Sequence, residues 1–280
     1  MAKKDFESNV QFMTEQWINL KQDLHNDVIQ YDDLGKLISK YMFFNRFDNV
    51  FKETSKIFEV NLSDIKHMYR GVSEEIALNY YERMIPKIEF AKGHNRMNPP
   101  GKAFLYVGVL GKDKGKDENT IKKHVVKTVL KEIRATDNSI ATICKFKIND
   151  SAKNKKVINI CGDSSIPKSD AELSDYLYKH VVKGFTVDKE KLSYILANVY
   201  FNMFSSDQIF KPVNTNEQEV KKYEYAPFHA IANYISEQGY AGLIFRSTVH
   251  QNGSNLVLFD PSDASVIQNS MEHINTSDYL

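Results

Sequence analysis

Two arginines stand in sequence contexts that suit the binding of a phosphate group. Arg70 directly precedes Gly71, and Arg96 leads into the turn-forming run Met97-Asn-Pro-Pro-Gly101. A guanidinium donates two parallel hydrogen bonds to phosphate oxygens, so two arginines beside rigid turns could grip a diphosphate. Taken alone, each arginine is more often a surface residue or a partner in a salt bridge.

Three further polar residues lie in apolar or turn-rich contexts. Tyr106 lies in the strand-like run 104–110, where a tyrosine is usually a core residue, but its ring could also stack on an aromatic heterocycle. Glu132 could form an ordinary exposed pair with Arg134. Ser247 follows Gly-Leu-Ile-Phe-Arg, where a predicted strand ends in a polar loop. Each residue has a plain structural explanation by itself.

The common signatures of nucleotide-binding, hydrolytic and metal sites are absent. The sequence has no G-x-x-x-x-G-K loop, no G-x-G-x-x-G after a strand, no G-x-S-x-G and no H-E-x-x-H. Its two cysteines, Cys144 and Cys161, form no C-x-x-C pair and have no histidine cluster beside them. We therefore expect neither a disulfide framework nor a metal site.

Length, charge and hydrophobic content limit the class of protein that can position these residues. Its 280 residues fit one large domain or two modest ones. Lys and Arg number 37 against 36 Asp and Glu, a balance that argues against a nucleic-acid clamp or a polybasic membrane binder. Hydrophobic residues make up 42%, enough for a packed core, and no apolar run is long enough to span a membrane. The first ten residues lack the apolar region of a signal peptide, so we expect a soluble, cytoplasmic protein.

The order of predicted elements is mixed, without regular alternation of strands and helices. Residues 1–66 have helical spacing of Phe and Trp side chains, which we expect to form a packed helical face rather than a partner-binding surface. The pattern further predicts strands at 104–110, 140–148, 157–161, 242–245 and 255–260, and we expect the strands at 140–148 and 157–161 to pair with each other. Helices are predicted within 170–205 and over 227–238. Residues 111–131 should form a lysine-rich loop followed by a helix, and the end of the chain a loose tail. This order favours an α+β fold.

Four sequence blocks in this order resemble the RES domain family. The blocks are Tyr69-Arg70, RMNPPGKAFLY over 96–106, TVLKEIR over 128–134, and a last block running from Tyr225 through GYAGLIFRS and NGSNLVLF to Phe259. The resemblance covers about 67–261 and leaves out the helical start of the chain. It implies three parts: a helical N-terminal region over 1–66, a RES domain over 67–265 and a loose C-terminal tail over 266–280.

The resemblance implies a split, curved β-sheet with flanking helices, as in ADP-ribosyltransferases. It also implies a bacterial toxin of a toxin–antitoxin pair that cleaves the nicotinamide–ribose bond of NAD by hydrolysis or phosphorolysis. NAD would be the substrate, no metal is expected, and the partner would be an Xre-type antitoxin. Neither a membrane nor a nucleic acid is expected as a partner.

Residue roles follow from the same resemblance. Glu132 would stabilise the positive charge that builds on the ribose, and Arg70 and Arg96 would hold the diphosphate. Tyr106 would pack against nicotinamide or its ribose. Ser247 would form a hydrogen bond with the ribose or help to place the arginines. Glu132 comes 26 positions after Tyr106, about twice the expected spacing, which points to a lysine-rich insertion. Without an insertion, Glu118 competes for the acidic role, but the T-x-x-x-E-I-R context favours Glu132.

Other functions stay open at this point. The same site could transfer ADP-ribose to a protein or a nucleic acid. The chain could instead be a non-catalytic interaction module that binds a partner through its helical N-terminal region. A weaker alternative is RNA binding or cleavage by that region together with the lysine-rich loop.

Overall fold

A computed structural model describes residues 15–110, 117–167, 170–183, 186–204, 213 and 215–280. The chain divides into two compact units, each built from segments that are distant in the sequence. The first unit contains the described residues of Met1–Glu59, His94–Arg96 and Ile160–Tyr234, and the second contains Val60–Gly93, Met97–Asn159 and Ile235–Leu280.

The first unit is helical and has an aromatic core. Its helices are residues 15–25, α2 (Leu34–Lys40), α3 (Met42–Thr54), α5 (Asp170–Val181), α6 (Lys189–Phe204) and most of α7 (Gln218–Glu237), with a two-stranded hairpin, β6 (Val182–Lys183) and β7 (Thr186–Val187), after α5. Trp17 meets Phe43 and Phe228 edge to face, with ring centroids 4.9 and 5.5 Å apart. Phe47 packs on Tyr234, whose hydroxyl donates to Asp48 at 2.7 Å. The predicted stripe of Phe and Trp is therefore a packed helical face.

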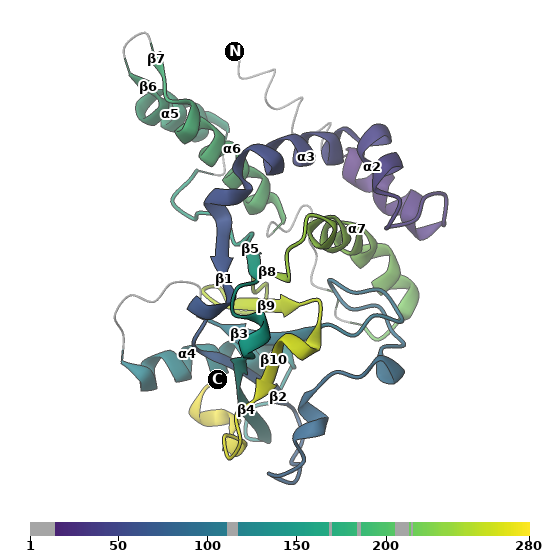
Figure 1. Cartoon of the computed structure of the whole chain (residues 1–280), viewed down its shortest axis with the longest axis vertical. Helices are drawn as coiled ribbons and strands as arrows, with labels where there is room; N and C mark the ends of the chain where they lie inside the picture. Colours follow the sequence, from purple (N-terminus) through teal and green to yellow (C-terminus); the bar gives the residue numbers. More distant parts are fainter. Residues whose placement is uncertain (1–14, 111–116, 168–169, 184–185, 205–212, 214) are drawn as a thin grey trace. The chain divides into compact units, whose positions relative to one another are not determined.

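The second unit is built on a sheet of nine strands among the described residues. The strands are β1 (Glu59–Asn61), β2 (Met68–Val72), β3 (Leu105–Val109), β4 (Ile140–Ile148), β5 (Lys156–Asn159), β8 (Gly242–Arg246), β9 (Ser254–Leu258), β10 (Ala264–Val266) and β11 (Glu272–Asn275). Their order is β1-β5-β8-β9-β3-β2-β4-β10 (Figure 1). Strand β11 also pairs with β4. Strands β2, β3, β9 and β8 are antiparallel neighbours at the centre of the sheet.

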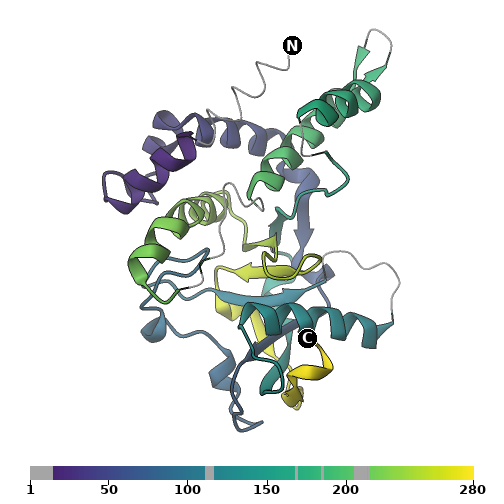
Figure 2. The same cartoon turned by 180° about the vertical axis from the view of Figure 1, so that it is seen from behind.

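Helix α4 (Glu118–Glu132) lies on one face of this sheet, the teal helix across the strands in Figure 2. Val125 and Val129 pack over β3 where Gly108 has no side chain. A Cβ at Gly108 would come within 2.7 Å of a Val129 methyl group, closer than two carbon atoms can approach. Gly71 on β2 gives similar room to Val129, so two glycines let the helix sit low on the sheet.

Much of the predicted element order is confirmed, and the fold is α+β as expected. The strands predicted at 104–110, 140–148, 242–245 and 255–260 are β3, β4, β8 and β9. The helix predicted over 227–238 is α7, which begins earlier, at Gln218, and contains Pro227. It ends as predicted at Gly239, whose positive φ of 86° suits glycine. Residues 111–116 of the lysine-rich loop lie outside the described residues.

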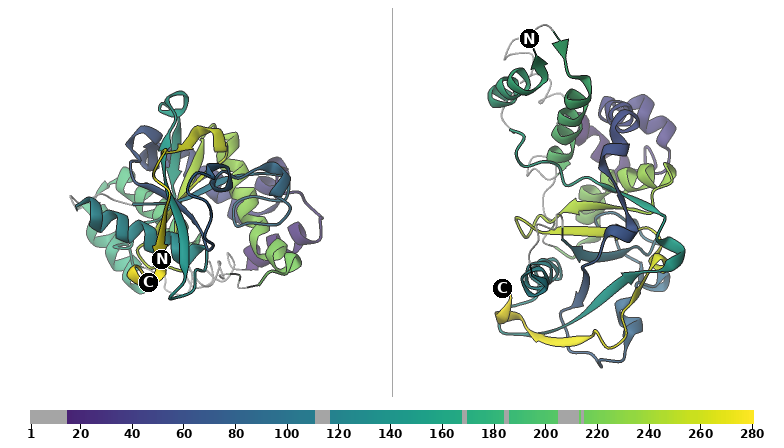
Figure 3. Two further views of the ribbon diagram at one scale, coloured as in Figure 1. Left: turned by 90° about the horizontal axis from the view of Figure 1, so that it is seen from below. Right: turned by 60° about the vertical axis from the view of Figure 1, so that its left-hand side comes forward.

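Three local expectations are wrong. The segment predicted to pair with β4 is β5, which runs parallel to β8 instead, with Val157 opposite Gly242. Residues 266–280 are not a loose tail, because β11 pairs antiparallel with β4. Strand β11 belongs to the yellow segment near the C-terminus in Figure 3. The stretch 1–66 is not wholly helical, since it ends with β1 and a 3-10 turn, Leu62–Asp64. The boundaries of the three predicted parts stay a prediction.

None of the helices in the described part of the chain is long and apolar enough to cross a membrane.

Candidate functional site

One face of α4 contacts the hairpin formed by β8 and β9. His124, Thr128 and Glu132 are spaced four residues apart and therefore lie on one side of the helix, one per turn. Each contacts the hairpin. His124 Nε2 lies 3.0 Å from the carbonyl oxygen of Asn252, and the Asn255 amide donates to Glu132 Oε1 at 2.6 Å.

The middle contact of this row needs a glycine. A Cβ at Gly253 would lie 2.6 Å from both Cγ2 and Oγ1 of Thr128, so only glycine allows this approach of loop and helix. Thr128 is fully buried, and its hydroxyl also lies 2.8 Å from His250 Nδ1. The blocks T-x-x-x-E and N-G-S-N, more than a hundred residues apart in the sequence, thus fit together side chain by side chain.

Glu132 is the last residue of α4 and is partly buried. Its carboxylate accepts a hydrogen bond from the neutral amide of Asn255, which is 6% exposed, and no ion pair to Glu132 exists among the described residues. The alternative acid, Glu118, is exposed at the first position of the same helix. At about 1.5 Å of rise per residue, the two carboxylates lie about 20 Å apart along the axis, and only Glu132 meets the hairpin.

Ser247 organises the β8–β9 loop, residues 247–253. Its hydroxyl oxygen accepts hydrogen bonds from the backbone N–H groups of His250 at 3.0 Å and Val249 at 3.3 Å. Its own backbone N–H donates to the carbonyl of Gly253 at 2.8 Å. Ser247 is 4% exposed, and these contacts leave its hydroxyl hydrogen available as a donor.

Arg70 lies on the face of the sheet away from α4. Its neighbour Tyr69 packs with Val125 and Val129 of that helix, so side-chain alternation sends Arg70 to the other face, opposite Cys144 on β4. One guanidinium nitrogen, Nη1, donates to the Tyr106 carbonyl at 3.1 Å. The Nε atom is buried with no hydrogen-bond partner, and no carboxylate in the described part of the chain pairs with the guanidinium.

Burial dominates the electrostatics around Arg70. It lowers the pKa of the guanidinium and raises the pKa of the facing Cys144 thiol to about 12. That cysteine is therefore a neutral core residue rather than a nucleophile. An anionic ligand would stabilise a partly buried cation that has an unused buried donor.

Tyr106 holds the turn that follows Arg96. Its hydroxyl donates to Asn98 Oδ1 at 2.7 Å and accepts the Met97 backbone N–H at 3.0 Å. The Asn98 amide in turn donates to the Lys102 carbonyl at 2.7 Å, and Asn98 is buried. The start of this turn is thus fastened to Tyr106 on β3, and Asn98 links the start to the end.

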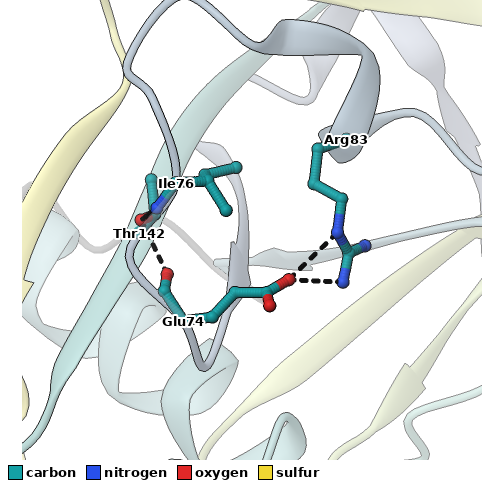
Figure 4. Close-up of polar contacts among 4 residues, drawn as sticks. All are labelled: Glu74, Ile76, Arg83 and Thr142. Carbon is teal, nitrogen blue, oxygen red and sulfur yellow. Dashed lines mark hydrogen bonds and ion pairs between the residues drawn. The ribbon is translucent and has the colours of Figure 1, made fainter.

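The segment after β2 is fastened to β4 through one hydroxyl (Figure 4). Thr142 Oγ1 donates to the Glu74 carbonyl at 2.8 Å and accepts the Ile76 N–H at 3.2 Å. Arg83 donates twice to one carboxylate oxygen of Glu74, at 2.6 and 3.0 Å. Thr142 lies opposite Val72, on the same sheet face as Arg70, so these contacts fix the chain directly beyond the arginine.

The predicted site residues fall into two groups within the second unit. Glu132 bonds Asn255 of the hairpin, and Ser247 lies in the loop of the same hairpin. Arg70 on β2 donates a hydrogen bond to the backbone carbonyl of Tyr106 on β3. Within the described chain, no hydrogen bond or ion pair joins Arg70 to Glu132 or Ser247. Arg96 belongs to the first unit, whereas the other four residues belong to the second.

Three polar residues of this site were not singled out from the sequence: His124, His250 and Asn255. A signal for the first was present, because H-x-x-x-T-x-x-x-E places three polar side chains on one helical face. Asn255 and His250 gave no such signal, since their partners lie on a distant helix. Among the described residues, no cluster of His, Cys, Asp or Glu is arranged to hold a metal ion.

Comparison with known proteins gives one family. A search of curated proteins found no match. Residues 199–277 match the family model described as RES domain, a range that contains Ser247 and Asn255 and begins after the blocks of Arg70, Arg96, Tyr106 and Glu132. This match agrees with the predicted family over 79 of the 280 residues.

Proposed function

We propose that this chain cleaves the bond between nicotinamide and ribose in NAD. The RES domain match supports an NAD-related function of toxin type at the level of the family. The observation that carries the finer proposal is the Glu132 carboxylate, which accepts a hydrogen bond from the neutral Asn255 amide and forms no ion pair within the described part of the chain. Such a carboxylate keeps its negative charge available for a developing positive charge.

The reaction needs that charge because of its leaving group. As the C1′–N bond breaks, its electron pair moves to the ring nitrogen, and nicotinamide leaves as a neutral molecule. Positive charge then builds on C1′ and the ring oxygen of ribose, as in glycoside cleavage. Glu132 would stabilise this charge and accept a hydrogen bond from a ribose hydroxyl. An oxygen nucleophile would then bond to C1′ and lose a proton.

The remaining residues would bind the dinucleotide. The Arg70 guanidinium has a buried, unused Nε donor and pairs with no carboxylate among the described residues, so it suits a diphosphate oxygen. Arg96 would add a second guanidinium, Tyr106 would pack against nicotinamide or its ribose, and Ser247 has a hydroxyl hydrogen to donate to a ribose oxygen. Water or inorganic phosphate would be the acceptor, with a macromolecule as the alternative, and an Xre-type antitoxin would be the partner that restrains the enzyme.

The test exchanges one carboxylate at a time. Glu132→Gln keeps the shape and the acceptor oxygen but removes the charge, and it should lower NAD turnover by about 100-fold or more, the usual cost of one preorganised electrostatic group. Glu118→Gln is the matched control on the same helix and should turn over NAD at the wild-type rate. Wild-type turnover by the Glu132 variant, or loss of turnover only in the Glu118 variant, would refute the assignment.

A further inference from the structure

One tautomer of His250 satisfies both contacts of its neighbour Thr128. The Thr128 hydroxyl has one hydrogen and two groups within reach, the His124 carbonyl at 3.1 Å and His250 Nδ1 at 2.8 Å. Both contacts are hydrogen bonds only when Nδ1 carries a hydrogen and donates to Thr128, which leaves the lone pair on Nε2. The backbone of His250 is also engaged, because its N–H donates to Ser247 and its carbonyl accepts from Gly253 at 2.9 Å.

These three contacts give His250 a place between the helix and the site. The backbone contacts shape the β8–β9 loop, and the imidazole ties that loop to the middle turn of α4. The loop leads directly into Ser254 and Asn255, and Asn255 donates to Glu132 one turn further along the helix. A change at His250 would therefore move the donor that holds the carboxylate.

We propose that His250 is a positioning residue, whose Nδ1–H bond to Thr128 holds the β8–β9 loop on α4 and so places Asn255 and Ser247 beside Glu132. The inference rests on the proposed function for its activity readout, but the placement of the loop is measurable without NAD. His250 touches no reacting atom in this account and acts only through the loop.

The positively charged groups around His250 oppose protonation of its imidazole. The His124 ring lies 5.0 Å away, and Lys127 and Lys131 lie on the same helix. Burial first, and then these three groups, lower the pKa of His250 below its ordinary value of 6.5. Glu132 is the acidic group nearest along this face of α4, and the loop itself contains no charged side chain. Protonation would place a second positive charge in a positive setting.

The sign of the pH effect follows from that lowered pKa. The hairpin contact is fully formed above about pH 6.5, where His250 is neutral in the folded and the unfolded chain. As the pH falls through the lowered pKa of His250, the loop loses stability relative to α4. Turnover of NAD should therefore have an acid limb that belongs to His250.

The experiment uses the full chain and pairs of variants. His250→Asn places an amide nitrogen where Nδ1 was and should keep turnover near neutral pH while removing the acid limb. His250→Ala should lower turnover by several-fold to about tenfold and speed amide hydrogen exchange in the hairpin, as expected for one lost hydrogen bond. Thr128→Val should behave like His250→Ala, and Thr128→Ser should restore the wild-type values.

Nitrogen NMR of the imidazole is the readout that does not depend on NAD. The Nδ1–H tautomer at neutral pH, together with faster hairpin exchange in His250→Ala, supports the inference. An Nε2–H tautomer, unchanged exchange in His250→Ala, or an acid limb that persists in His250→Asn overturns it. If no variant and no wild-type sample consumes NAD, the proposed function fails, while the tautomer and exchange data still decide the role of His250.

Discussion

Removing the Asn255 amide tests whether Glu132 depends on its neighbour. In Asn255→Ala, the carboxylate loses the 2.6 Å bond donated by a residue that is almost fully buried. A hydrogen bond to a charged group contributes about 1.5–3 kcal/mol. If that bond is fully used in the transition state, the loss at about 1.4 kcal/mol per factor of ten is about 10- to 150-fold in kcat.

A double-mutant cycle makes this prediction sharp. Nicotinamide release from NAD is measured for the wild type, Asn255→Ala, Glu132→Gln and the double variant, with urea unfolding of each as the check on folding. Because Asn255 acts through Glu132, its substitution should cost little once the carboxylate is gone. Equal losses in both backgrounds would show that the amide acts on the substrate or the fold instead.

A shape-matched variant separates loss of the donor from loss of packing. Asn255→Asp keeps the volume but turns a carboxylate oxygen toward Glu132, so both the bond and the charge balance are lost. We expect kcat to fall at least as far as in Asn255→Ala and the free energy of unfolding to fall as well, since two facing carboxylates repel. Activity close to wild type in this variant would contradict the geometry.

Three further outcomes are expected. Arg70→Lys, which keeps the charge but loses the planar fork, should weaken NAD binding measured by calorimetry, and unchanged affinity would argue against a diphosphate contact. Gly108→Ala should lower the free energy of unfolding by about 1–3 kcal/mol, because its new methyl group meets Val129, and an unchanged urea midpoint would show that α4 can shift. Thr142→Val loses two hydrogen bonds that fasten the segment after β2 and should cost about 1–3 kcal/mol, whereas Thr142→Ser should retain most of that stability.

The sequence predicted the local elements better than their partners. Alternating apolar residues identified the strand Ile140–Ile148 with its bounds, and Gly239 marked the end of α7. The strand Lys156–Asn159 was also expected, but its pairing with β8 was not. Alternation reports which residues face a core, whereas the choice of neighbouring strand depends on contacts between distant segments, so a short polar turn after β4 wrongly favoured a hairpin.

The partners of the candidate site residues could not be predicted from the sequence either. The spacing of Thr128 and Glu132 indicates one helical face, but nothing local shows that this face meets Gly253 and Asn255. Likewise, the motif around Arg70 does not show on which face of the sheet its side chain lies. That face follows from the packing of its neighbour on α4, which only the assembled sheet determines.

Product analysis of NAD shows directly whether this chain breaks the bond between nicotinamide and ribose. The purified chain is incubated with NAD, with and without inorganic phosphate, and the products are separated by chromatography. The proposal predicts one nicotinamide released for each NAD consumed, with ADP-ribose or its phosphate ester as the second product. Intact NAD, or cleavage within the diphosphate to give nicotinamide mononucleotide and AMP, would contradict it.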